Sequence, residues 1–199
     1  MATAHKFYIK TKVNLNKLRA GTSKEVFNNF NEISDCIVHY CDDTNITYAS
    51  LDISGKLYVH LVNVSILSVK LGMGLGLTLP ELKILALGGL LHDIGKLYVP
   101  AKILNKPTKL DVKEKIEINK HVELGFNLLP ENLQKNIVGE IVLNHHNVFN
   151  KDLGPLYNDY VFICGIADVV DAMLSYRPYK KPLPARMVIE EVKNKGGDF

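Results

Sequence analysis

The chain has 199 residues, 47% of them hydrophobic, which is enough apolar material for one domain with a hydrophobic core. Its 24 basic and 21 acidic side chains nearly balance and leave a formal net charge of +3. This balance argues against a protein that coats a nucleic-acid polymer or binds a membrane surface, whereas it is compatible with a small anionic ligand.

The cysteines and the chain's start bear on its compartment. Cys36, Cys41 and Cys164 lie in apolar segments and form no CxxC pair, which is typical of buried thiols in a reducing compartment. No long apolar core follows the basic first ten residues, as a signal peptide would require. The apolar run over residues 67–91 is interrupted by charges and a proline, so it predicts two buried helices instead of a membrane span. We expect a cytoplasmic protein.

The first predicted helix runs from about Ser23 to Cys41. Thr22 and Glu25 have the spacing of a capping box, and hydrophobic residues then recur at helical period. Turn-forming residues end this helix, so residues 1–50 are expected to form an N-terminal appendage with one helix. The main domain then covers residues 51–199.

Helical spacing continues through the main domain. The expected helices run from Leu57 to Met73, from Thr78 to His92, from Asp111 to Leu129, from Glu131 to His146 and from Tyr160 to Ser175. Thr78 and Glu81 form a capping-box pair at the start of the second helix, and Asp111 and Glu114 start the third. Because no segment shows the alternation of a strand, the predicted fold class is all-α.

The histidines carry the first indication of function. Five of the seven fall in predicted helices with apolar neighbours: His60, His92, His121, His145 and His146. Asp93 directly follows His92, and an adjacent imidazole and carboxylate can serve two metal ions, because the carboxylate can bridge them. An isolated His-Asp pair is more often a hydrogen bond at a helix end. Convergence of the histidine-bearing helices would favour the metal site.

Two carboxylates interrupt the last predicted helix. A buried carboxylate needs a partner, since an unpaired buried charge is strongly destabilising. We favour a metal ion as the partner of Asp168. For Asp171, two alternatives stay open: a role in the site, or a structural one such as a cap or an ion pair with Arg177 or Arg186.

In this order the motifs resemble the HD-GYP branch of the HD phosphohydrolase superfamily. They are His60, Leu90 to Lys96 with its His-Asp pair, Lys120-His121 with Gly125, His145-His146, Ala167 to Ala172, and Arg177 to Lys180. The resemblance covers about residues 55–199. It implies an HD-domain helical bundle around a metal centre that hydrolyses the bacterial second messenger cyclic di-GMP.

The resemblance also implies roles for individual residues. The implied metal ligands, with Asp93 bridging, are His60, His92, Asp93, His121, His145, His146 and Asp168. Lys96 matches a lysine near the scissile phosphate, which makes Asp93 and Lys96 the expected catalytic residues, and Arg177 and Lys180 match nucleotide contacts. The implied cofactors are two divalent metal ions, iron or manganese, holding a hydroxide in line with the leaving ribose oxygen.

The chain departs from the family pattern in three places. After His146 the family has an Asp-Gly-x-Gly-Tyr-Pro loop, whereas residues 147–155 lack the tyrosine and keep little of the pattern. The family continues into closing helices beyond position 199, so we expect a C-terminally truncated domain. Trinuclear members carry a glutamate four residues before the first histidine, where this chain has Lys56. If the helix reaches that far back, the ammonium would repel a third cation, which predicts two ions. The alternative is a helix that begins after Gly55 and leaves Lys56 in solvent.

Three functions from different classes stay open. The first is a phosphodiesterase acting on cyclic di-GMP or a related cyclic dinucleotide. The second is a receptor that binds cyclic di-GMP and signals through a protein partner without efficient turnover, which the altered loop favours. The third is an HD-type hydrolase of another nucleotide or phosphoester. None involves a nucleic-acid polymer or a membrane.

Overall fold

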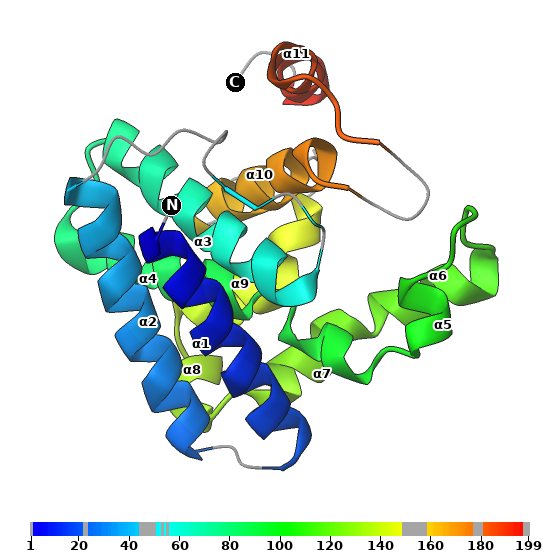
Figure 1. The fold of residues 1–199 in the computed structure, drawn as a ribbon, viewed down its shortest axis with the longest axis horizontal. Helices are drawn as coiled ribbons and strands as arrows, with labels where there is room; N and C mark the ends of the chain where they lie inside the picture. The colour runs from blue at the N-terminus through cyan, green and yellow to red at the C-terminus, as the bar shows by residue number, and fades with distance from the viewer. Residues whose placement is uncertain are drawn as a thin grey trace.

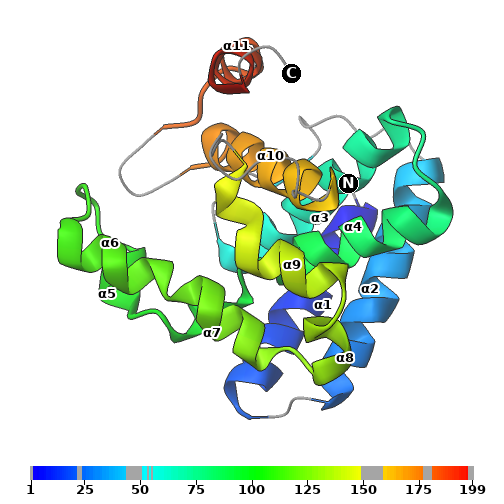
Figure 2. The same ribbon diagram turned by 180° about the vertical axis from the view of Figure 1, so that it is seen from behind.

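The structure is a computed structural model that describes residues 2–21, 24–43, 51, 52, 54, 56–148, 159–176 and 181–196. All regular structure in these ranges is helical, and no strand occurs in them. The predicted all-α fold is therefore confirmed. Figures 1 and 2 show helices packed around a central pair, with a narrow arm on one side and a last helix at the periphery.

Two antiparallel helices form the N-terminal part, α1 (Ala2–Arg19) and α2 (Lys24–Asp43) (Figure 1). The helix α2 was predicted, but the expectation of one helix in residues 1–50 missed α1. The reason lies in its inner face, where Thr11 and Asn14 are buried among apolar residues and interrupt the hydrophobic stripe. The Thr22 capping residue lies outside the described residues.

The central pair consists of α3 (Leu57–Gly74) and α4 (Leu79–Leu91), close to their predicted bounds. A Cβ added at Gly89 would lie 2.6 Å from the Cα atom of Ser65, so this glycine allows the two backbones to approach closely. One hydrophobic cluster joins this pair to α1 and α2. The N-terminal helices therefore share the main core, and the division at residue 50 stays a prediction.

Among the described helices, α3 alone has the length and hydropathy that a membrane span requires, and 61% of that stretch is buried inside the protein. Buried core helices commonly have the same composition. The packing of α3 against α4 in the core therefore accounts for its apolar sequence.

The arm contains η2 (Ile94–Tyr98), α5 (Ala101–Leu104), α6 (Val112–Asn119) and α7 (His121–Leu128) (Figure 2). The prediction of one helix from Asp111 to Leu129 is wrong, because the helix breaks at Lys120. At this division the backbone of Lys120 keeps helical dihedral angles, and the His121 side chain hydrogen-bonds the carbonyl of Ile118 at 2.5 Å. The predicted helix start at Asp111 is confirmed, and Asp111 forms a capping box with Glu114.

The next predicted helix is also divided, into α8 (Glu131–Gln134), α9 (Ile137–Asn144) and η3 (His145–Asn147). Asn136 is extended and its side chain accepts a hydrogen bond from the amide of Val138 at 2.8 Å, so it begins a new helix. This arrangement places the two adjacent histidines at a helix end, as predicted.

The helix α10 (Asp159–Leu174) confirms the last predicted helix and lies across α3 and α9 (Figure 2). The final helix, α11 (Ala185–Gly196), was not predicted and contacts α10 through a small cluster that includes Met173, Leu174 and Val188. Two carboxylates on α10, Asp168 and Asp171, are buried on the side where α3, the end of α4 and η3 bring their histidines.

Candidate metal centre

The seven predicted ligands lie together in the middle of the fold. They come from α3 (His60), the end of α4 (His92 and Asp93), α7 (His121), η3 (His145 and His146) and α10 (Asp168). All are buried except His146, whose side chain is 45% exposed. They form two groups of four residues, and within each group the ligand atoms lie within 4.8 Å of one another.

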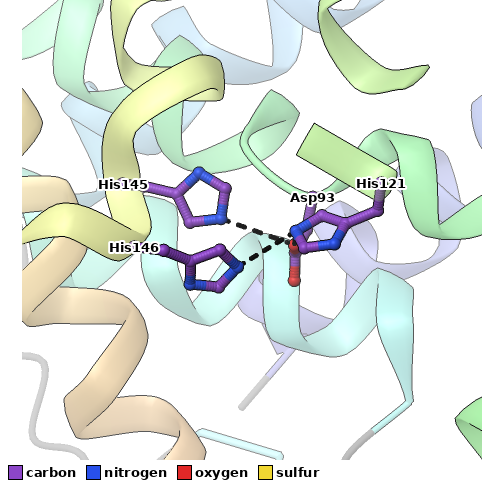
Figure 3. Close-up of side chains that lie close together, drawn as sticks. All are labelled: Asp93, His121, His145 and His146. Carbon is purple, nitrogen blue, oxygen red and sulfur yellow. Dashed lines mark hydrogen bonds and ion pairs between the residues drawn. The ribbon is translucent and has the colours of Figure 1, made fainter. Parts of the chain in front are cut away.

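The first group consists of Asp93, His121, His145 and His146, and Figure 3 shows their side chains pointing toward one another. The Oδ1 atom of Asp93 lies 3.0 Å from Nε2 of His121 and 3.7 Å from Nε2 of His145. The Nε2 atoms of His121 and His146 are 3.1 Å apart. Three imidazoles and one carboxylate oxygen thus surround one point.

The second group consists of His60, His92, Asp93 and Asp168. The Oδ2 atom of Asp93 lies 3.3 Å from Nε2 of His60 and 3.4 Å from Nε2 of His92. The Oδ1 atom of Asp168 lies 3.1 Å and 3.8 Å from the same two nitrogens. Asp93 therefore belongs to both groups and offers a different oxygen to each, which is the arrangement of a carboxylate that bridges two cations.

Four of the five imidazoles are oriented by hydrogen bonds at Nδ1. The partners are Asp171 for His60, at 2.6 Å, and main-chain carbonyl oxygens for the other three: Gly89 for His92, Ile118 for His121 and Val142 for His145. A carbonyl oxygen only accepts, so Nδ1 donates and the Nε2 lone pair faces the cluster. Metal-binding histidines have this outer contact as a rule.

The inward-facing atoms lack ordinary partners. Across the described residues, the Nε2 atoms of His60, His92 and His145 and Oδ1 of Asp93 are buried without a partner at hydrogen-bond geometry. Buried polar atoms are normally paired, so four converging exceptions need an explanation. Neutral imidazoles and an ionised carboxylate suit a divalent cation, and the residues present therefore fit a metal centre.

The charges of the two carboxylates agree with that role. Burial opposes ionisation of Asp93, but the Lys96 ammonium and His92 outweigh it and hold the pKa of Asp93 well below its usual range. For Asp168, burial again raises the pKa, but the His60 imidazole, whose Nε2 lies 3.1 Å from Oδ1, outweighs burial and lowers the pKa. Both carboxylates are thus ionised near neutral pH, as metal ligands must be.

The surroundings shift the pKa values of two imidazoles in opposite directions. Burial alone would lower the pKa of His60, but three carboxylates around it, those of Asp168, Asp171 and Asp93, raise it to about 10. Burial and the neighbouring His145 lower the pKa of His146 to about 3. The second group therefore favours positive charge at its centre, whereas His146 stays neutral.

The other residues that the sequence singled out stand outside the two ligand groups. Lys96, in η2, pairs with Oδ2 of Asp93 and lies partly exposed at the edge of the cluster. Arg177 and Lys180 lie outside the described residues. Lys56 is exposed at the N-cap of α3, which begins at Leu57, so of the two alternatives for this residue the structure shows the second, with Lys56 in solvent.

Two contributions were not predicted. The role of Asp171 stayed open in the sequence because its partner His60 lies 111 residues away. At Gly95, an added Cβ would lie 2.0 Å from the carbonyl oxygen of His121 and 2.5 Å from the amide of Gly125, so η2 packs directly on the backbone of α7. Both glycines stand in the quoted motifs, but only the fold shows that they touch.

Comparison with known proteins shows which family the chain resembles. The HD domain family matches residues 57–173. A cyclic di-GMP phosphodiesterase of Pseudomonas aeruginosa is 35% identical over 149 residues, which cover 71% of this chain and 36% of that protein. A 3′3′-cGAMP-specific phosphodiesterase of Vibrio cholerae is 33% identical over 146 residues, 69% of this chain and 28% of that protein. The chain thus spans about a third of the length of these relatives.

One solved structure is similar along almost the whole chain. It is an HDG"Y"P protein from Bdellovibrio bacteriovorus, with a TM-score of 0.71 and 20% identity, and the match covers 95% of this chain and 64% of that one. At this identity the likeness supports the fold alone. From the match over 57–173, the chain belongs to the HD domain family, a family of metal-dependent proteins, and the family resemblance of its motifs is confirmed.

Proposed function

We propose that this chain is a metal-dependent phosphodiesterase that hydrolyses cyclic di-GMP or a related cyclic dinucleotide. The observation that carries the proposal is the pair of ligand groups that share Asp93, since two adjacent cations suit phosphodiester hydrolysis. The names of the relatives support a cyclic dinucleotide as the substrate class. The substrate of this chain is a proposal because the chain spans only part of those proteins.

Two divalent metal ions are the proposed cofactors, one in each ligand group. Mixed imidazole and carboxylate ligands suit iron, manganese or zinc better than magnesium, and iron or manganese is proposed from the family resemblance. When bound, the ions supply Lewis acidity and lower the pKa of a water molecule. The carbonyl contacts at Nδ1 support this role, because they keep the ring nitrogens that face the cluster free of protons.

The chain's own residues have separate proposed roles. Asp93 aligns the two ligand groups, and Lys96, beside it, offers positive charge where negative charge develops on the phosphoryl oxygens. Arg177 and Lys180 are proposed to contact the nucleotide. We further propose a cytoplasmic location, which three free cysteines support, and a protein partner in signalling.

Hydrolysis by the purified chain tests the proposal. The protein, loaded with Mn²⁺ or Fe²⁺ under reducing conditions, is incubated with cyclic di-GMP and with 3′3′-cGAMP, and the products are separated by chromatography. Linear products should form with the wild type and not with Asp93→Ala. The matched control is Asp35→Ala, which removes a surface carboxylate paired with Lys83 at 2.9 Å and should leave the rate unchanged.

A second candidate, a receptor without efficient turnover, is favoured by the departure of residues 147–155 from the family loop. A metal-loaded chain that binds cyclic di-GMP and releases no product would support the receptor and contradict the phosphodiesterase. A chain that ignores both dinucleotides but cleaves another nucleotide from a substrate panel would support a different HD-type hydrolase.

A further inference from the structure

A buried hydrogen-bonded chain leads from the N-terminal helix to the candidate metal centre. It starts at Tyr8 on α1, whose side chain is only 5% exposed. The Tyr8 hydroxyl donates to Oδ1 of Asn63 at 2.9 Å, and its oxygen accepts from the main-chain amide of Asp52 at 3.2 Å. Because the Asp52 amide can only donate, the Tyr8 proton is directed at Asn63.

The second member is Asn63, which is fully buried on α3 one helical turn after His60. Its Nδ2 atom donates to Oδ1 of Asp171 and to the carbonyl oxygen of Asp52, both at 2.8 Å. All contacts of this amide depend on one orientation. Rotated by 180°, it would turn its oxygen toward the Asp171 carboxylate, which has no proton to donate.

The third member is Asp171 on α10. Its Oδ1 atom accepts from Asn63 and, at 3.2 Å, from the hydroxyl of Ser175, while Oδ2 lies 2.6 Å from Nδ1 of His60. With the carboxylate held at both oxygens, Asp171 keeps one proton of His60 on Nδ1 and aims Nε2 at the second ligand group, where a bound cation would take the place of the second proton.

We propose that Tyr8 is a positioning residue of the metal centre: its hydroxyl orients Asn63, which orients Asp171, which fixes the tautomer and the ring of His60. Burial raises the pKa of Tyr8 to about 12, so the hydroxyl keeps the proton that this role requires. The helix α1 is then part of the site. This inference rests on the proposed role of His60 as a metal ligand.

The test is Mn²⁺ affinity of the full chain, measured from the electron paramagnetic resonance signal of free Mn²⁺ in a titration. Tyr8→Phe removes one oxygen and should weaken one of the two binding constants by about 3- to 10-fold, the size expected for one buried hydrogen bond. Asp171→Asn keeps the shape but presents an amide to His60, and it should weaken the same constant by about 10- to 100-fold.

The matched control is Tyr58→Phe. Tyr58 also lies on α3 and faces α1, where the Lys12 ammonium is 5.6 Å from the centre of its ring. Removing its hydroxyl should leave both Mn²⁺ constants unchanged. A double-mutant cycle adds a second readout: Asn63→Leu and Tyr8→Phe should not add, since both break the same chain.

The outcomes separate this inference from the function on which it rests. A wild-type chain that binds no Mn²⁺ would overturn both. A wild type that binds, with Asp171→Asn impaired and Tyr8→Phe unchanged, would overturn only the role of Tyr8. Effects of Tyr8→Phe and Asn63→Leu that add fully would also overturn it, because independent sites add and members of one network do not.

Discussion

At the scale of single residues, the two oxygens of Asp93 divide the site. One oxygen faces His60 and His92, the other faces His121 and His145, and the side chain is fully buried. A carboxylate in that position fixes the separation of the two ligand groups. The Lys96 ammonium contacts the oxygen on the His60 side, so positive charge is available at the edge of the cluster.

Lys96→Ala tests how much the Lys96 ammonium contributes to turnover. The variant should keep its bound metal, because lysine is no ligand, and should lose about 10²- to 10³-fold in kcat, the usual effect of removing one group that stabilises developing charge. The control is Lys102→Ala, at an exposed position on α5. Metal content and single-turnover rates are measured on the same preparations. Equal rates in the two variants would remove the proposed role of Lys96.

Among the helices that carry the site, glycines allow neighbouring backbones to come into direct contact. The backbone of η2 at Gly95 meets the backbone of α7 at His121, which leaves no room for a side chain. A few tenths of an ångström at this contact would move a ligand of the first group relative to Asp93. Packing of elements thus sets the geometry of the metal centre.

Gly95→Ala should therefore disturb both stability and metal binding. The added methyl group would overlap main-chain atoms, which cannot rotate away, and we expect a loss of about 1 to 3 kcal/mol in urea unfolding together with reduced metal content. Gly74→Ala is the matched control, because a Cβ at Gly74 meets nothing within 4 Å. Full metal content and unchanged stability in the Gly95 variant would show that α7 can move without consequence.

The start of α4 gives a prediction about pH. The Glu81 carboxylate accepts from the amide and the hydroxyl of Thr78, at 2.7 and 2.6 Å, and from the hydroxyl of Tyr160 at 2.8 Å. The hydroxyl and amide of Thr78 lower the pKa of Glu81. Its contribution to stability is therefore complete above the ordinary glutamate pKa and is lost as the pH falls through the lowered value.

Glu81→Gln should accordingly melt at a lower temperature than the wild type at pH 7, and the difference should shrink in acid. Thermal unfolding by circular dichroism over a series of pH values measures it. The control is Glu32→Gln, at an exposed position within α2. A difference that stays constant down to acid pH would show that the charge of Glu81 has no part in the cap.

Helical period was sufficient to predict the helices with strong, regular apolar faces, and it failed where polar groups interrupt them. The core helices α3, α4 and α10 fall close to their predicted bounds. The helix α1 was missed because Thr11 and Asn14 occupy buried positions on its inner face. The start of α9 was missed because it depends on a side-chain bond to the main chain, from the amide of Val138 to Asn136.

At the scale of the whole molecule, the site exists only because distant parts of the chain meet. The order of the motifs, through a family resemblance, was sufficient to name seven candidate ligands, and the fold brings all seven side chains together. Spacing alone could not pair His60 with Asp171, nor connect Tyr8 of the expected appendage to the site through Asn63. Such pairings are tertiary contacts and leave no local pattern in the sequence.

The most direct test of the central claim, two cations held by two groups that share Asp93, is the metal content of the chain. Elemental analysis of protein purified without chelator should give two ions per chain, and anomalous diffraction should place one in each ligand group. Asp93→Ala should lose both. One ion per chain, a third ion with ordered density, or two ions retained by Asp93→Ala would contradict the account.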